Sequence, residues 1–112
     1  KEIKAFIKPK RVQVVVKSLR DAGFESVTLS KGEGTGAHKD PDASPSLDFR
    51  FTDSPIVKLE LVCQNEETEK AVQLICGKAQ TPDPGDGIIY VSEIDDAYRI
   101  KTGKSIKRFD MK

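Results

Sequence analysis

The sequence predicts an α+β domain of the ferredoxin-like class, with the element order strand, helix, strand, strand, helix, strand. Two segments carry apolar residues at helical spacing, and each lies between segments of strand character. Residues 32–55, rich in glycine, proline and serine, separate the two strand–helix–strand halves. A chain of 112 residues is expected to form one domain, so we assign residues 1–112 to a single unit.

The first strand–helix–strand unit precedes Gly32. Residues 2–7 place apolar side chains at alternate positions, as a strand does, and Pro9 ends this pattern. The next segment has apolar residues at i, i+3, i+4 and i+7, which form one face of a helix: Val12, Val15, Val16 and Leu19. Gly23 is expected near the C-cap of this helix, and a second strand then begins with Phe24, Val27 and Leu29.

The segment from Gly32 to Pro55 is expected to be a long loop, because glycines and prolines alternate there with serines and aspartates. Long loops in compact domains usually carry function or lack order. We expect its central part, residues 37–54, to be flexible.

The second unit begins with the clearest strand, residues 56–63, in which one face is apolar: Val57, Leu59, Leu61 and Cys63. Asn65 is expected to be the N-cap of the second helix. The apolar stripe of that helix is Val72, Ile75, Cys76 and Ala79. The run Ile88–Val91 predicts a buried strand, and residues 104–112 are expected to form a polar C-terminal tail.

The composition excludes several classes of function. Charged residues make up 33% of the chain with mixed signs, and the formal net charge is +1, so neither nucleic acid nor an anionic membrane is an expected partner. No apolar run approaches the roughly 20 residues of a membrane span, and no signal peptide is visible. Cys63 and Cys76 are expected to be buried thiols in a reducing cytoplasm. Because His38 is the sole histidine, a catalytic triad has little support, and we do not expect an enzyme.

The turn Gly85-Asp86-Gly87, before the last strand, is the strongest candidate for a binding site. Glycines let backbone N–H groups approach an anion closely and form a concave binding site for it. The prolines before the turn limit its freedom and so lower the cost of ordering it. The alternative is a simple tight turn. Arg99 and Lys101 alternate with Ile100, so both could leave one side of an extended segment; the alternative for this pair is a solvated basic edge.

Five motifs occur together in one order: IKPK, KGEGTG, KLELVC, TPDPGDGIIYV and YRIKTG. In that order and spacing the sequence resembles the PII signal-transduction family from Glu2 to about Gly103. The resemblance implies a homotrimer that binds adenine nucleotides in clefts between subunits. It also implies that residues 37–54 are the T-loop, the segment through which the family docks target proteins.

The resemblance also implies the binding residues. Gly85, Asp86 and Gly87 would approach the phosphates, and Arg99 and Lys101 would reach them from a neighbouring subunit. The full implied set for the nucleotide is Thr28, Gly34, Thr35, Gly36, Glu60, Val62, Gly85, Asp86, Gly87, Ile88, Arg99 and Lys101. Ala37 and His38 stand at the positions associated with the loop and a second effector.

Several positions depart from the family pattern. Ile88 stands where the family usually has lysine, Ala37 where it has arginine, and His38 where it has a glutamine that helps to hold magnesium and 2-oxoglutarate. Lys101 replaces a second arginine, and no tyrosine lies between Gly32 and Pro55 to be nucleotidylylated. The sequence therefore resembles a divergent branch of the family, similar to regulators linked to inorganic-carbon handling or to transporters.

We therefore expect a cytoplasmic nucleotide sensor that binds ADP or AMP, with ATP as an alternative, and controls a transporter or enzyme through the T-loop. Whether Mg²⁺ takes part stays open, as does the second effector: bicarbonate, 2-oxoglutarate, a cyclic nucleotide or none. One alternative function is a metal-responsive trimer similar to divalent-ion-tolerance proteins, with His38, Asp40 and Asp42 as ligands. A slow nucleotide hydrolase, with Glu33 or Asp86 orienting water, is another.

Overall fold

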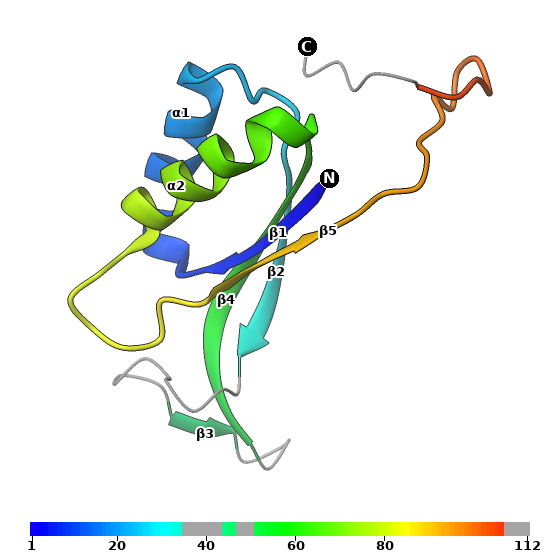
Figure 1. Ribbon diagram of the computed structural model, residues 1–112. Coiled ribbons are helices and arrows are strands. Elements are labelled where there is room, and N and C mark those ends of the chain that lie inside the picture. The colour runs from blue at the N-terminus through cyan, green and yellow to red at the C-terminus, as the bar shows by residue number, and fades with distance from the viewer. Residues whose placement is uncertain (35–43, 47–50, 107–112) are drawn as a thin grey trace.

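The structure is a computed structural model that describes residues 1–34, 44–46 and 51–106. Apart from one additional short strand within the expected loop, its elements follow one another in the predicted order (Figure 1). The strands are β1 (Glu2–Ile7), β2 (Thr28–Gly34), β3 (Ser44–Ser46), β4 (Phe51–Val62) and β5 (Ile88–Ser92). The helices are α1 (Val12–Asp21) and α2 (Thr68–Ala79), each preceded by a short 3-10 turn, η1 (Pro9–Arg11) and η2 (Asn65–Glu67).

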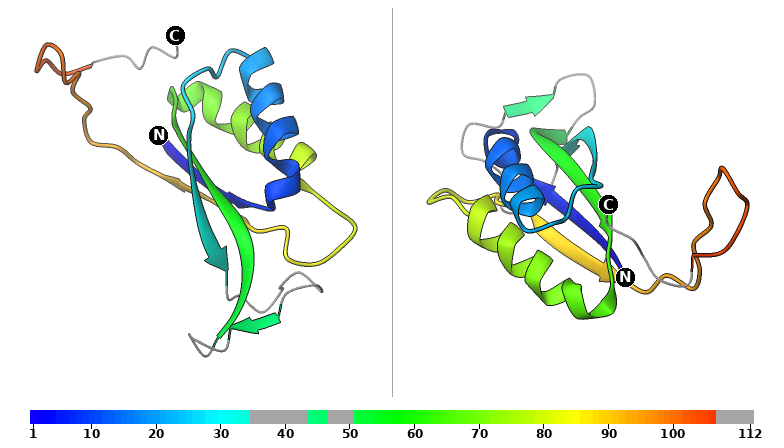
Figure 2. Two further views of the ribbon diagram at one scale, coloured as in Figure 1. Left: turned by 180° about the vertical axis from the view of Figure 1, so that it is seen from behind. Right: turned by 90° about the horizontal axis from the view of Figure 1, so that it is seen from above.

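The strands form one antiparallel sheet in the order β2-β4-β1-β5, and the short β3 pairs with β4. Both helices lie against the same face of this sheet, and no other described element covers the opposite face (Figures 1 and 2). This arrangement confirms the predicted ferredoxin-like fold.

The core lies between the helices and the sheet. Alternate residues of β1 and β4 point into it, so the side chains that contact the helices come from every second position: Ile3, Ala5, Ile7, Val57, Leu59 and Leu61. From α1, Val15 and Leu19 are fully buried, as the predicted apolar face requires. Full burial of one such side chain contributes about 1.5–3 kcal/mol, so packing holds α1 although its valines are poor helix formers.

The end of α1 is closed by the predicted glycine. Gly23 has a φ of 99° and donates to the carbonyl of Arg20, while the N–H of Phe24 donates to the carbonyl of Leu19. This pair of bonds is a Schellman motif, which needs a left-handed residue where glycine stands. Phe24 and Leu19 are both buried, so the motif also brings the chain into the core.

The loop between the halves is shorter than predicted. β2 continues to Gly34, and β4 already begins at Phe51, so both strands extend into the segment expected to be loop. Gly34 pairs with Ser54 and Glu33 with Pro55 at the outer end of this hairpin. Proline is tolerated there because the pairing of β1 with β4 ends at Val57, so Pro55 lies outside the part of β4 that pairs with both β1 and β2. Residues 35–43 and 47–50, most of the expected T-loop, lie outside the described residues.

Two expectations for the second helix are wrong. Asn65 does not cap α2, because the chain first makes the 3-10 turn η2 and the helix starts at Thr68. Cys76 is only half-buried, because the core-facing side of α2 runs through Ala71, Ile75 and Ala79. Cys63 is buried as predicted.

β5 is not the buried strand that its apolar run suggests. Among the described strands it lies at the edge of the sheet, next to β1, and Ile88, Tyr90 and Val91 are 54%, 54% and 44% exposed. Only Ile89 packs against the core. A continuous apolar run is typical of burial on both faces, but here α2 covers little of the strand and the other face is open.

Residues 97–106, which we call the C-terminal hairpin, form a small paired unit beyond β5. Arg99 N–H donates to the carbonyl of Lys104, and Ile106 N–H donates to that of Ala97. Residues 104–106, at the start of the expected polar tail, take part in this hairpin, and residues 107–112 lie outside the described chain. Figures 1 and 2 show the hairpin standing away from the sheet and helices at the end of an extended connection.

Among the described residues, no helix is both long enough and apolar enough to cross a membrane.

Candidate functional site

The loop between α2 and β5, residues 80–87, lies beside the end of β1 (Figure 1). Gly85 and Gly87 have φ values of 88° and 103°, in the left-handed region that only glycine adopts without strain. A Cβ on Gly87 would also collide with the carbonyl oxygen of Phe6. The Gly85-Asp86-Gly87 segment therefore passes directly against the backbone of β1, and both glycines are required by its path.

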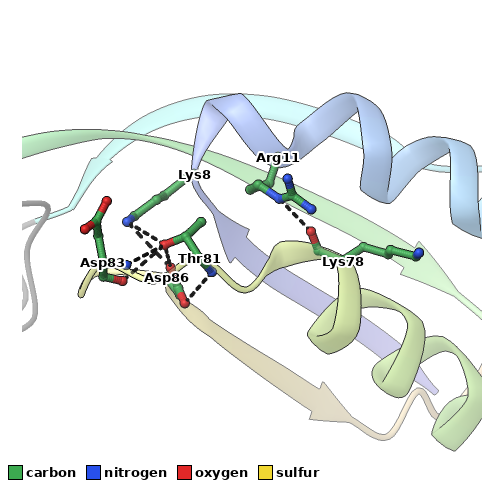
Figure 3. Close-up of polar contacts among 6 residues, drawn as sticks. All are labelled: Lys8, Arg11, Lys78, Thr81, Asp83 and Asp86. Atoms are coloured by element: carbon green, nitrogen blue, oxygen red, sulfur yellow. Dashed lines mark hydrogen bonds and ion pairs between the residues drawn. The ribbon is translucent and has the colours of Figure 1, made fainter.

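Three side chains hold this loop in place: Lys8, Thr81 and Asp86 (Figure 3). The hydroxyl of Thr81 hydrogen-bonds to Asp86 Oδ1, and the N–H of Thr81 donates to Asp86 Oδ2 over 2.9 Å. Lys8 Nζ lies 3.1 Å from Thr81 Oγ1 and 3.5 Å from Asp86 Oδ1. Because Thr81 and Asp86 stand at the two ends of the loop, these bonds close it into a ring.

The carboxylate of Asp86 is held in its charged form. Partial burial by itself raises the pKa of Asp86, but the hydrogen bonds from Thr81 and the neighbouring ammonium of Lys8 outweigh it, so the pKa lies below the ordinary value. Both oxygens already accept hydrogen bonds. Asp86 is thus a structural anchor of the loop, and its geometry does not favour the role of orienting water that the hydrolase alternative assigned to it.

A second cation from the same turn holds the start of this segment. Arg11 Nε donates to the carbonyl of Lys78 in the last turn of α2, over 2.7 Å (Figure 3). The C-terminal end of a helix carries partial negative charge, so a guanidinium is favourable there. Lys8 and Arg11, which flank Pro9 and Lys10, therefore fix residues 78–86 against the junction of β1 and α1.

The predicted nucleotide-binding residues that the structure describes fall into two groups, at different ends of the sheet. Toward the end of β1 lie Gly34, at the end of β2, and Gly85 to Ile88, since Ile88 pairs with Phe6. Thr28 and Glu60 are directly opposed, and Val62 pairs with Glu2, which also pairs with Ser92 at the end of β5. Thr28, Glu60 and Val62 thus lie farther along the open face, away from the glycine loop.

The C-terminal hairpin belongs to the second group. It follows β5, whose ends at Ile88 and Ser92 are separated by roughly 13 Å at about 3.3 Å per residue. Figures 1 and 2 show the hairpin at the opposite end of β5 from residues 80–87. Within one chain, therefore, Arg99 and Lys101 are not brought to the Gly85-Asp86-Gly87 loop.

The hairpin corrects one expectation about these two cations. Residues 100–102 form its turn, and Gly103 N–H donates to the carbonyl of Arg99 over 2.7 Å. Lys101 therefore lies in a turn rather than in an extended segment, and the alternation argued from Ile100 does not apply. Both cations and Ile100 are exposed, Ile100 completely.

Four predicted residues, Thr35, Gly36, Ala37 and His38, lie outside the described part of the chain, as do the aspartates of the metal alternative. Within the described ranges no group of three or more His, Cys, Asp or Glu side chains could hold a metal ion.

Sequence reasoning missed Lys8 and Thr81. Lysine is rarely buried, and nothing in its neighbourhood signals that Lys8 turns inward. Lys8 belongs to the IKPK motif, which carries part of the family resemblance but does not indicate burial. Thr81 opens the quoted TPDPGDG segment, where a threonine five residues before an aspartate could have suggested a side-chain closure of the loop.

Comparison with known proteins gives consistent matches over nearly the whole chain. A family model described as "Nitrogen regulatory protein P-II" matches residues 1–104. Nitrogen regulatory protein P-II 2 of Methanothermobacter thermautotrophicus is 35% identical over 109 residues, covering 96% of this chain and 95% of the relative. The P-II proteins of Bradyrhizobium diazoefficiens and Rhodospirillum rubrum are 35% and 34% identical, covering 94% and 93% of this chain and 95% and 94% of the relatives.

Proposed function

Since the chain belongs to the P-II family of nitrogen regulatory proteins, we propose that it is a homotrimeric regulator that binds an adenine nucleotide between subunits. The relatives it matches are regulatory proteins by name. In this proposal the Gly85-Asp86-Gly87 loop binds phosphates through backbone N–H groups, and the nucleotide state controls a target protein through the T-loop. No residue makes or breaks a covalent bond.

The observation that carries the proposal is the separation of the two groups of candidate residues. The glycine loop lies at one end of β5 and the hairpin with Arg99 and Lys101 lies at the other (Figure 1). The glycine loop offers backbone N–H groups, and the hairpin offers the cationic side chains of Arg99 and Lys101. A phosphate is bound most strongly where both kinds of donor meet. A neighbouring copy that places its hairpin against the glycine loop would complete the site.

The exposed edge of the sheet supports this assembly. Ile88, Tyr90 and Val91 present apolar surface on an edge strand, and an exposed apolar edge favours pairing with another chain. Beyond them Tyr98 and Ile100 are 63% and 100% exposed on the hairpin. A second copy would cover these side chains.

The charges on the open face of the sheet are compatible with burial between subunits. Lys58 Nζ lies 3.3 Å from Glu60, and Lys4 Nζ lies 3.7 Å from Glu2. Burying an unpaired charge is costly, whereas a charge that already has a partner can be covered at less cost. This face could therefore approach the centre of a trimer without new partners for its charges.

The nucleotide is proposed to be ADP or AMP rather than ATP. Ile88 contributes no charge beside the glycine loop, and Ala37 contributes none at the base of the T-loop. A third phosphate would bring charge that must be desolvated without matching donors. A small anion such as bicarbonate is the second effector that we propose, from the resemblance to family members linked to inorganic-carbon handling.

The T-loop is proposed to dock a transporter or an enzyme and to change its order when the nucleotide binds. The absence of tyrosine from residues 32–55 excludes nucleotidylylation of a loop tyrosine, so we propose regulation through ligands alone.

The decisive experiment is calorimetric titration of ADP, AMP and ATP, with and without Mg²⁺, into wild type and Arg99→Ala. Loss of a charged donor to a phosphate should weaken every nucleotide by about 1.5–3 kcal/mol, or roughly 10- to 150-fold. Lys104→Ala is the matched control, because Lys104 is an exposed cation of the same hairpin whose hydrogen bonds there are made by its backbone. Equal binding by wild type and Arg99→Ala would remove the hairpin from the site. Failure of the wild type to bind any of the three would end the proposal.

A further inference from the structure

Lys8 is a buried cation whose side chain contacts the loop between α2 and β5. It directly follows β1 and is only 4% exposed. Lysine side chains are seldom buried, because an ammonium loses its hydration there and needs hydrogen bonds and an opposite charge in return. Here the partners within reach include Thr81 and Asp86, both of the loop.

We propose that Lys8 is a positioning residue for phosphate binding: by holding Thr81 and Asp86 it fixes the Gly85–Gly87 backbone in the form that receives the anion. The inference rests on the proposed function, since the ligand is the nucleotide phosphate assigned there. Lys8 acts through the loop and does not itself contact the ligand.

The first part of the mechanism is pre-organisation. The loop from Thr81 to Asp86 is closed by the bonds of Thr81 to Asp86, and Lys8 contacts both side chains. Thr81 Oγ1 also accepts a hydrogen bond from the N–H of Asp83 over 3.3 Å, and the Asp83 carbonyl, 3.1 Å away, is an alternative acceptor for its single hydroxyl proton. A loop already ordered before binding avoids the entropy cost of ordering it around the ligand.

The second part is electrostatic. A carboxylate next to an anion site repels the anion, and Asp86 stands between the two glycines. The ammonium of Lys8, 3.5 Å from Asp86 Oδ1, offsets this charge from the buried side. Without Lys8 the same loop would present an uncompensated negative charge to the phosphates.

The test compares Lys8→Met with Lys10→Met. Both variants lose one lysine of the same short segment, but Lys10 is exposed. Three quantities are measured for each: the affinity for ADP by calorimetry, hydrogen exchange of the N–H groups of Asp83, Gly85, Asp86 and Gly87, and the titration of the Asp86 carboxyl by carbon NMR. The last readout reports the charge of Lys8 directly and would not move for a general loss of stability.

In Lys8→Met we expect ADP affinity to fall on the order of tenfold or more, the four N–H groups to exchange faster, and the Asp86 carboxyl to titrate at higher pH. Lys10→Met should match the wild type in all three. ADP binding by Lys8→Met that equals the Lys10→Met control would overturn the inference, as would unchanged exchange in the loop.

Two further outcomes are informative. If wild type binds no nucleotide but exchange in the loop still depends on Lys8, the proposed function falls while the ordering of the loop by Lys8 stands. If Lys8→Met does not fold, Thr81→Val decides, because it removes the hydroxyl that Lys8 and Asp86 share and keeps both charges. Thr81→Val with wild-type affinity and exchange would refute the positioning role; weaker binding with faster exchange would support it.

Discussion

The carbonyl oxygen of Phe6 occupies the place that a Cβ on Gly87 would need. The obstacle is the backbone of β1 near its end, and Gly87 also has a φ of 103°. We therefore predict that Gly87→Ala lowers the free energy of unfolding by about 2 kcal/mol or more, from strain and displacement together. Urea unfolding measures this.

The matched control for Gly87→Ala is Gly77→Ala. Gly77 lies within α2, and a Cβ there meets nothing within 4 Å. Alanine in a helix is favoured over glycine by about 0.8–1 kcal/mol, so this variant should be as stable as wild type or more so. A Gly87→Ala protein as stable as Gly77→Ala would show that the loop does not pass against β1 as described.

Acidification should weaken the contribution of Asp86 to stability. Burial raises the pKa of Asp86, but the hydrogen bonds of Thr81 and the charge of Lys8 lower it further, so the folded-state pKa lies below that of the unfolded chain. The stabilisation is therefore complete above the unfolded-state pKa and is lost as pH falls through the folded-state pKa. The Tm of wild type should exceed that of Asp86→Asn near neutral pH, and the gap should close in acid. A gap that stays constant down to the lowest pH tested would contradict this assignment.

The exposed hairpin should control assembly without controlling folding. Ile100 is completely exposed, so Ile100→Asp removes no contact within the chain. We expect wild type to have the mass of a trimer by light scattering and Ile100→Asp to shift toward smaller species. Its far-UV circular dichroism should stay that of the wild type. Val14→Asp, an exposed position on α1, is the control and should remain a trimer. A monomeric wild type at micromolar concentration would remove the site between subunits.

A lysine at position 88 should change the nucleotide preference. Ile88 is 54% exposed at the start of β5, so Ile88→Lys should be accommodated without disturbing the core. An added charged donor beside the glycine loop is expected to strengthen ATP binding by about 1.5–3 kcal/mol and ADP binding by less. Ile88→Gln, of similar length and without charge, is the control.

In calorimetry the wild type should bind ADP or AMP at least as tightly as ATP, with no gain from 2-oxoglutarate. If the wild type bound ATP tenfold more tightly than ADP, the inference that Ile88 leaves the site without a donor for the third phosphate would be wrong.

The sequence predicted correctly those elements that bury one face in the core and leave the other face outside it. The alternation of β1 and the i, i+3, i+4, i+7 spacing of α1 have a single geometric solution each, and Gly23 marks the end of α1 because few residues adopt its conformation. β5 was misjudged for the opposite reason. Its apolar residues are compatible with a strand buried in the core and also with an exposed edge strand that pairs with another chain. The amino-acid composition does not distinguish these two environments.

The candidate site was predictable only in part. Gly85 and Gly87 indicate an unusual backbone conformation because they are glycines. Nothing near Lys8 in the sequence indicates that it is buried, because its partners Thr81 and Asp86 are more than 70 residues away. The hairpin turn that displaces Lys101 from an extended segment depends on backbone bonds between Arg99, Gly103 and Lys104, which an alternating pattern does not reveal.

The distance between the glycine loop and the hairpin on one chain has a genetic consequence. If each site takes its loop from one subunit and its cations from the next, damage to the loop in one subunit and damage to the hairpin in another complement each other in a mixed ring. A subunit carrying Arg99→Ala keeps an intact loop, and a subunit with a damaged loop keeps an intact hairpin. Any ring that contains both kinds has a single junction where the two intact halves face each other. Coexpression of two inactive alleles should therefore restore part of the nucleotide binding that neither shows by itself.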